Sequence, residues 1–251
     1  MSRNLLRPLI YLIMIISGIA RADQLSELTQ NAEQGDSKAQ TELGVRYANG
    51  QGVERRYDVA AQWFRQAAAK GNRLAEFNLG LLFLHGDGVL ANHHEAAEWF
   101  RKAAIRGDRQ AQVNLGMMYI HGDGVPRNYP AAAQWLQKAA EKADPIAEVN
   151  LGVMYALGHG VSKDHAAASR WFQQAADQGN GLAQHHLGLS FLDGKGEPKD
   201  HKSAYFWFLL AAGQGDQSAR DFLDELEQEL TPKEIVEVQH LAAEWKPKLS
   251  K

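Results

Sequence analysis

The sequence predicts an all-α solenoid. The pair Leu-Gly recurs every 36 residues without a slip, at Leu43-Gly44, Leu79-Gly80, Leu115-Gly116, Leu151-Gly152 and Leu187-Gly188. Five tryptophans keep the same period, namely Trp63, Trp99, Trp135, Trp171 and Trp207. Apolar residues between them recur at helical spacing. A fixed period of this length is typical of repeats that each form one supersecondary unit and pack on their neighbours.

Each repeat is predicted to contain two helices with good N-caps. The five copies cover residues 36–71, 72–107, 108–143, 144–179 and 180–215. Every copy begins with Asp or Asn, whose side-chain oxygen can accept a free backbone N–H of the first helical turn. The second helix begins at a residue of the same kind in four copies, at Asn92, Asn128, Asp164 and Asp200. Arg56 takes this position in the first copy and is the exception.

The first helix is predicted to pack closely on another helix. In the first copy its apolar side is formed by Ala39, Leu43, Gly44 and Tyr47. The second helix carries its own apolar stripe, which is Ala60, Trp63, Phe64, Ala67 and Ala68. A glycine within a helix costs about 1 kcal/mol relative to alanine. Because this glycine recurs in every copy, we expect a neighbouring helix to approach it, with the indole of Trp63 or its equivalents nearby.

Glycines punctuate the repeats. A Gly-x-Gly pair follows each first helix, as at Gly50 and Gly52, and glycine permits the positive φ angles of tight turns. A phosphate-binding loop would need a preceding strand and the rest of a nucleotide motif, and the sequence has neither. Four second helices also end at a glycine, namely Gly71, Gly107, Gly179 and Gly215. Ala143 replaces it in the third copy, so we expect the junction of repeats 3 and 4 to differ in geometry.

The segments beside the five copies are predicted to cap the solenoid. Residues 23–35 align with the second half of a repeat and form an N-terminal capping helix. Residues 216–251 form a partial repeat followed by a C-terminal capping helix. In the partial repeat, Asp224 and Glu227 stand where the copies have glycine and an aromatic residue. Polar residues at these positions suit a terminal repeat with one face in water.

The last helix has a strong start signal. Thr231 and Glu234 form a capping box, and Pro232 occupies the first helical position, where its missing N–H is no loss. The helix that follows is expected to carry Trp245 over the end of the core, and Pro247 is expected to stop it.

The recurrent pattern A-x-x-x-L-G-x-x-Y-x-x-G-x-G-V, followed by A-x-x-W-[FL]-x-x-A-A, resembles the Sel1-like repeat family of the exported bacterial type. This family is related to the tetratricopeptide repeat, and the match covers residues 36–215. The resemblance implies antiparallel helix pairs stacked into a right-handed superhelix. It also implies binding of other proteins, without catalysis.

Residues 1–22 are predicted to be a signal peptide that is cut after Ala22. A basic start with Arg3 and Arg7 precedes an apolar stretch, and an A-x-A cleavage site follows. The apolar stretch is shorter than the roughly 20 residues of a membrane span, and retention as a membrane anchor is the alternative. We therefore expect a periplasmic or secreted protein without stable membrane insertion after cleavage. The absence of cysteine excludes disulfides and a Cys-linked lipid anchor.

Charge and motif content argue against nucleic acid, metal, cofactor and catalysis. The formal net charge is -3, and no long basic run is present to contact phosphates. None of the 10 histidines lies three or four residues from another, so no pair shares a helix face in the usual metal-binding spacing. No Gly-x-Ser-x-Gly motif occurs, and no Ser, His and acid fall together on matching loop tips. We expect a protein that is not an enzyme, with no metal site and no cofactor.

The first helices are the expected contact surface, because in the related tetratricopeptide architecture they line the concave face. One row of side chains there reads Glu42, Asn78, Asn114, Asn150 and His186. Apolar or aromatic neighbours are Phe77, Leu81, Met117 and His185. An amide offers both a donor and an acceptor, so a ladder of asparagines can hold an extended backbone. The same rows can instead stabilise each first helix against its neighbours, and they can do both.

These observations predict a non-enzymatic periplasmic scaffold or adaptor that binds a protein partner through the concave face. One alternative is an immunity protein that binds and neutralises a secreted toxic effector, for example a lipase. A second alternative is a regulator of cell-envelope signalling or assembly.

Overall fold

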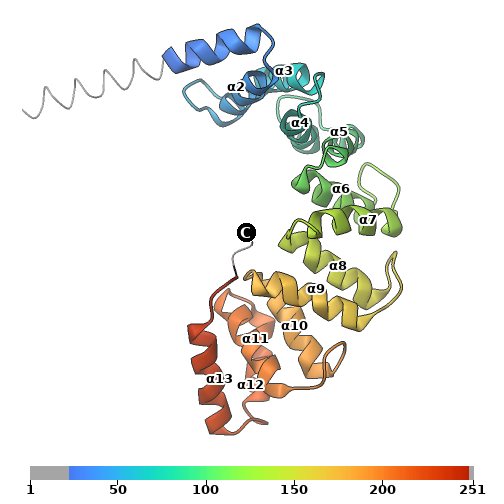
Figure 1. The fold of residues 1–251 in the computed structure, drawn as a ribbon, viewed down its shortest axis with the longest axis vertical. Helices are drawn as coiled ribbons and strands as arrows, with labels where there is room; N and C mark the ends of the chain where they lie inside the picture. Colours follow the sequence, from blue (N-terminus) through green and yellow to red (C-terminus); the bar gives the residue numbers. More distant parts are fainter. Residues whose placement is uncertain (1–22, 249–251) are drawn as a thin grey trace, which may run out of the picture. The chain divides into compact units, whose positions relative to one another are not determined.

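The computed structural model describes residues 23–248, and these residues contain helices and no strand (Figure 1). Residues 23–33 are helical. The helices that follow are α2 (Ser37–Asn49), α3 (Tyr57–Ala68), α4 (Arg73–His85), α5 (His93–Ile105), α6 (Arg109–His121), α7 (Tyr129–Ala140), α8 (Pro145–Leu157), α9 (His165–Asp177), α10 (Gly181–Asp193), α11 (His201–Gly213), α12 (Gln217–Leu226) and α13 (Pro232–Glu244). The all-α repeat solenoid is confirmed.

Each full repeat contains two helices, which together form one hairpin. α2 packs on α3, α4 on α5, α8 on α9 and α10 on α11, and each pair is joined by a glycine-containing loop (Figure 1). The chain divides into two compact units, Met1–Ala111 and Gln112–Lys251, which we describe separately. The right-handed superhelix stays a prediction. The predicted signal peptide, residues 1–22, lies outside the described residues, and none of the described helices combines the length and apolarity that crossing a membrane requires.

The predicted N-caps are formed. The first residue of every repeat accepts backbone N–H groups of the helix that follows, as Asp36 does from Lys38 and Ala39 at 2.7 and 3.0 Å. Second helices α5, α7, α9 and α11 are capped by Asn92, Asn128, Asp164 and Asp200. Arg56 makes no such bond and pairs with the Asp58 carboxylate instead, at 2.7 and 2.9 Å. The N-cap prediction is therefore correct at its exception as well.

The helical glycine lies against the second helix of its own repeat. A Cβ on Gly44 would lie 2.5 Å from the Phe64 ring, and one on Gly116 would lie 2.8 Å from Leu136. The close approach expected from the sequence is confirmed, but the contacting side chain is not the tryptophan. It belongs to the residue after it, which is buried, whereas Trp63 is half-buried. The same contact joins Gly80 to Phe100, Gly152 to Phe172 and Gly188 to Phe208.

The two loop glycines have separate roles. The first one, such as Gly86 at φ 77°, is the left-handed C-cap of the first helix. The second lies against the start of the preceding repeat's second helix: a Cβ on Gly88 would overlap the backbone of Tyr57, and one on Gly160 would overlap that of Tyr129. Gly196 meets the His165 carbonyl in the same way. These glycines therefore allow a close contact between consecutive repeats as well as a turn.

Ala143 corrects one expectation. Its φ is 54°, in the left-handed region that Gly71 and Gly215 occupy at 73° and 97°. Its backbone N–H bonds the Ala140 carbonyl at 2.8 Å, which matches the bond from Gly71 to Ala68. The junction between repeats 3 and 4 thus keeps the common geometry, and the prediction of a different one was wrong. Alanine is held in a conformation that costs an L-residue about 1–2 kcal/mol.

Both ends are capped. Ala32, in the helix over residues 23–33, is fully buried and packs with Ala39 and Leu43 of the first repeat. At the other end the capping box of Thr231 and Glu234 is present at the start of α13.

Trp245 lies just beyond the last helix, which was expected to carry it. α13 ends at Glu244, and Trp245 is extended, with its ring 6.4 Å from that of Trp207. The chain then passes to the end of α9, where the Lys248 backbone N–H donates to the Asp177 carbonyl at 2.7 Å. The tryptophan therefore packs on the last full repeat, as expected, but from an extended segment.

Replacing Ala143 by glycine should stabilise the protein by about 0.5–1 kcal/mol, because relief of the left-handed strain exceeds the entropy that glycine adds to the unfolded chain. Urea unfolding measures the change. The matched control is Gly215→Ala, since a Cβ there meets nothing within 4 Å and φ is 97°. This variant should lose about 1 kcal/mol from conformation alone. Equal stability of wild type and Ala143→Gly would contradict the strain.

Gly152→Ala should lower the free energy of unfolding by about 1–2 kcal/mol, because the added methyl group overlaps the Phe172 ring and overpacking outweighs the gain in helix propensity. The matched control is Gly213→Ala, also within a helix but with nothing within 4 Å of the new Cβ. The control should gain up to about 1 kcal/mol. Thermal unfolding of both variants tests the contact, and a stabilised Gly152→Ala would refute it.

Candidate protein-binding surface

The outward side of the first helices carries one stripe of side chains. In α8 it comprises Ile146, Asn150, Val153 and Leu157, and in α10 it comprises Leu182, His186, Leu189 and Asp193. The spacing of three and four residues places each set on one side of its helix. Three large apolar side chains of this stripe are exposed, with Ile146 at 54%, Leu157 at 56% and Leu182 at 55%. We call this stripe the first-helix face.

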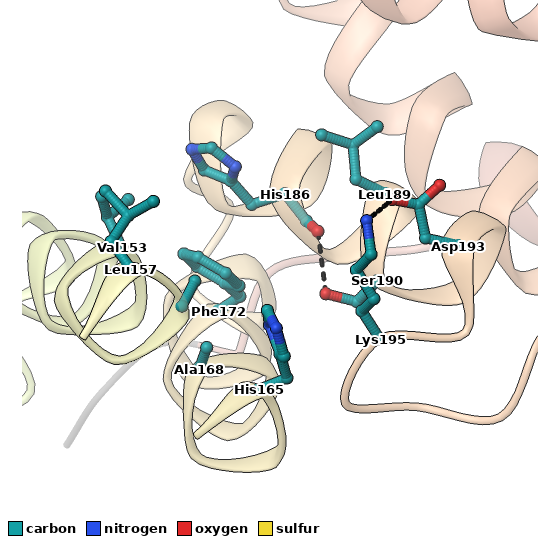
Figure 2. A pocket seen from close by; sticks show the side chains of 11 residues that line it. Val153, Leu157, His165, Ala168, Phe172, His186, Leu189, Ser190, Asp193 and Lys195 are labelled. Carbon is teal, nitrogen blue, oxygen red and sulfur yellow. Dashed lines mark hydrogen bonds and ion pairs between the residues drawn. The ribbon is translucent and has the colours of Figure 1, made fainter. Parts of the chain in front are cut away.

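A groove of about 340 Å³ lies between α8 and α10 over α9 (Figure 2). The lining side chains are Val153, Ala156 and Leu157 from α8, His165, Ala168 and Phe172 from α9, His186, Leu189, Ser190 and Asp193 from α10, and Lys195 from the loop. Most of these groups are apolar. We call it the α8–α10 groove.

The polar groups at the groove largely satisfy one another. The Lys195 ammonium lies 2.8 Å from the Asp193 carboxylate, so their charges compensate. The Ser190 hydroxyl donates to the His186 carbonyl at 3.0 Å (Figure 2). The groove therefore offers an apolar contact area with a neutralised rim.

His186 forms part of one wall. Its ring stacks on Phe172, with centroids 4.7 Å apart and planes at 18°. Burial lowers the pKa of His186 below its usual 6.5, and the neighbouring His185 adds to this, while Asp216 acts in the opposite direction. The imidazole is therefore neutral at pH 7 and behaves as an aromatic surface with polar edges.

A second hollow, of about 330 Å³, lies in the other unit between α2 and α4. Its lining comprises Lys38, Thr41, Glu42, Val45, Asn72 and Leu74. Glu42 is exposed and pairs with Arg46 at 2.9 Å on the same helix. The α8–α10 groove, in contrast, belongs to repeats 4 and 5.

The family model of the Sel1 repeat matches five consecutive segments, 37–72, 73–108, 109–144, 145–180 and 181–216. The chain belongs to the Sel1 repeat family. The segments begin one residue later than the copies defined above, so both divisions describe the same period. Sel1 repeats mediate protein–protein interaction, and the fold is generally non-enzymatic.

Two solved structures are similar at 32% identity. A Sel1 repeat protein from Oxalobacter formigenes matches with a TM-score of 0.77 over 90% of this chain and 98% of its own. A protective antigen of uropathogenic Escherichia coli strains, with an SLR fold, matches with a TM-score of 0.74 over 88% of this chain. This chain spans only 56% of that antigen. An immunity protein from Pseudomonas aeruginosa matches at 21% identity and a TM-score of 0.46, over 75% of this chain and 72% of its own. A comparison with curated proteins finds no match.

Two of the predicted contact residues of this Sel1 repeat protein lie inside it. Phe77 is only 8% exposed, and its ring lies 5.8 Å from that of Phe100. His185 points toward Asp216, with Nδ1 2.8 Å from the carboxylate, and packs on Phe208. Adjacent helical positions point about 100° apart, so these neighbours of the outward row turn toward the core.

Each asparagine of the predicted row lies on the outward side of its own first helix. Asn78 and Asn150 are half-buried, and each amide donates to a carbonyl one turn earlier, of Leu74 at 2.7 Å and of Ile146 at 2.8 Å. Asn114 has the equivalent, half-buried place in α6, and Leu81 and Met117 are half-buried beside this row. The amides thus stabilise their own helices, and their contact with a partner stays a prediction.

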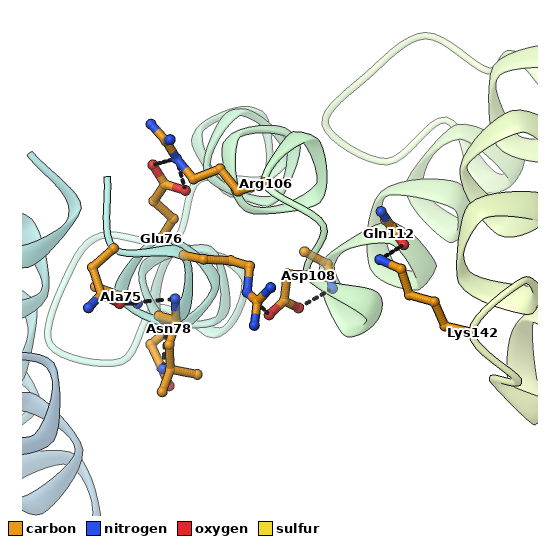
Figure 3. A network of polar contacts seen from close by, with 11 residues as sticks. Ala75, Glu76, Asn78, Arg106, Asp108, Gln112 and Lys142 are labelled. Atoms are coloured by element: carbon orange, nitrogen blue, oxygen red, sulfur yellow. Dashed lines mark hydrogen bonds and ion pairs between the residues drawn. The ribbon is translucent and has the colours of Figure 1, made fainter. Parts of the chain in front are cut away.

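A second row of polar side chains, not predicted from the sequence, is buried. It comprises Gln40, Glu76, Gln112, Glu148 and Gln184, each 3% exposed or less. Each one meets a polar group at the end of a second helix: Glu76 contacts Arg106 at 3.1 Å and Gln112 contacts Lys142 at 3.2 Å (Figure 3). The sequence does contain a pattern that indicates this row, because Gln or Glu follows the recurrent alanine of each first helix at the same 36-residue interval.

No group of three or more His, Asp or Glu side chains in the described part of the chain is arranged to hold a metal ion. The groove does contain Ser190, His165 and Asp193, but the serine bonds a backbone carbonyl and the aspartate bonds lysine.

His186→Asn should destabilise the Sel1 repeat protein by about 0.5–1.5 kcal/mol at about pH 7.5 through loss of the ring stack. The native state binds the His186 proton less readily than the unfolded state, so this contribution is full above the usual pKa of 6.5 and is lost as the pH falls below it. The difference in the free energy of unfolding between wild type and variant should become smaller at about pH 5. Urea unfolding at both pH values measures it. His240→Asn, at a 70% exposed side chain, serves as control, and a gap that widens in acid would contradict the burial effect.

Proposed function

We propose that this Sel1 repeat protein is a non-enzymatic scaffold that binds a protein partner on the first-helix face, with the α8–α10 groove at the centre of the contact. The observation that carries the proposal is the largely apolar groove, which exposed Leu157 lines, on helices that also expose Ile146 and Leu182. Exposed apolar side chains around a hollow are typical of interaction sites.

The energetics favour a partner that inserts apolar side chains. Burial of one leucine-sized side chain contributes about 1.5–3 kcal/mol. The neutralised Lys195–Asp193 pair at the rim adds little repulsion toward a partner of either charge. Contacts at the groove should therefore dominate the affinity.

We place the protein in the periplasm or outside the cell. The basic start, the apolar stretch and the A-x-A site of residues 1–22 support export, and a cysteine-free chain needs no oxidative folding there. N-terminal sequencing of the exported form should begin at Asp23, and a chain that keeps its first 22 residues in the membrane fraction would support an anchor instead.

A site-specific experiment tests the binding surface. A photo-crosslinking amino acid at Leu157 should capture a partner in the periplasm, while one at Ile105 should not, although Ile105 is 69% exposed. With the captured partner purified, Leu182→Glu should raise Kd by about tenfold or more, because the new carboxylate would be buried in an interface that excludes water. Ile105→Glu is the matched control and should leave Kd unchanged. Calorimetry of both variants measures the difference.

The identity of the captured protein distinguishes the roles open to such a scaffold. A secreted toxic effector whose toxicity this chain suppresses would assign an immunity function. An envelope protein would assign a role in cell-envelope signalling or assembly. Equal loss of affinity in Leu182→Glu and Ile105→Glu would reject the first-helix face as the binding surface.

A further inference from the structure

The buried polar row contains one carboxyl group with an unusual partner. Glu148 is 2% exposed, and its Oε2 accepts a hydrogen bond from the amide of Gln178 at 2.8 Å. Two repeats earlier, Glu76 is buried to the same degree but faces the Arg106 guanidinium at 3.1 Å. The same position thus has a cation as partner in one repeat and a neutral amide in another.

Among the described residues, no cationic side chain contacts the carboxyl group of Glu148. On its own helix, Asp144 adds a negative charge. In the turn after α7, Lys142 contacts Gln112 at 3.2 Å, and Glu141 lies within 3.5 Å of Gln137. At the end of α9, Asp177 is engaged by Lys248 at 2.8 Å. A buried carboxylate without a positive partner is strongly disfavoured.

The glutamines of the row show what a protonated carboxyl group can do here. Gln40 donates to the Ala32 carbonyl at 3.0 Å, and Gln184 donates to the Ala176 carbonyl at 3.4 Å, each at the end of the preceding helix. The equivalent acceptor for Glu148 is the carbonyl of Ala140, at the end of α7. A carboxylic acid has one O–H donor and can make this bond, whereas a carboxylate cannot.

We propose that Glu148 is a proton-linked switch in the core of the fourth repeat: its neutral form holds α8 against the ends of α7 and α9, and its ionisation loosens this junction. The proposal concerns folding and is independent of any binding partner. The equivalent junction at Glu76 lacks the switch, since Arg106 neutralises the carboxylate there.

Burial and, to a smaller extent, the negative charge of Asp144 raise the pKa of Glu148 to about 7, although the Gln178 hydrogen bond opposes the rise. The folded-state pKa is therefore above the usual 4.5 of the unfolded chain. The resulting stability is complete below that usual value and is lost as the pH rises toward 7. The burial of His186 acts in the opposite direction between pH 5 and 7, so wild type must be compared with variants rather than with itself.

Urea unfolding of the purified chain from about pH 5 to about pH 8 tests the switch. Glu148→Gln reproduces the side chain found at Gln40, Gln112 and Gln184, so it should fold. Relative to wild type, its folding equilibrium constant should rise by about a hundredfold across this range, because the pKa of Glu148 is about 7 in the folded chain and 4.5 in the unfolded chain. Gln178→Arg installs the partner that Glu76 has, and it should also remove most of the pH dependence.

Two controls make the result decisive. The stability of Glu76→Gln relative to wild type should not rise with pH in this way, because the carboxylate that it removes is paired with Arg106. A carboxyl carbon NMR titration of wild type should place the midpoint of Glu148 near 7. A pH-independent difference between Glu148→Gln and wild type, or an NMR midpoint below about 5, would overturn the proposal.

Discussion

The contact between the helical glycine and the second helix sets the geometry of every repeat. At Gly152 the backbone of α8 lies directly on the Phe172 ring, a distance that any Cβ would forbid. Packing at this distance fixes the rotation of the first helix about its own axis. Leu151 then points into the core, while Asn150 and Val153 turn outward. The exposed stripe that we assign to a partner is therefore a consequence of how closely the two helices pack.

Local signals in the sequence were sufficient for the helices, caps and turns. N-cap residues, Gly-x-Gly turns and apolar spacing act over a few residues, and each was found where expected. Side-chain direction was harder, because Trp63 and Phe64 differ by one position and only the packed structure shows which of them faces the glycine. Phe77 was misplaced for the same reason. Ala143 shows the opposite case, in which neighbouring repeats impose a backbone conformation that the residue itself does not favour.

The buried polar row shows how one geometry can hold different chemistry. The same pair of positions contains two glutamines at Gln184 and Gln214, but a carboxylate and a guanidinium at Glu76 and Arg106. A neutral pair responds little to salt or pH, whereas a charged or half-paired one responds to both. Repeats with nearly identical backbones can thus differ in their response to the environment.

The second loop glycine has a consequence for how such a chain can be rearranged. Gly88, Gly160 and Gly196 each touch the backbone of a helix that belongs to the repeat before. A deletion or duplication preserves these contacts only if it moves the chain by a whole period, wherever the cut is made.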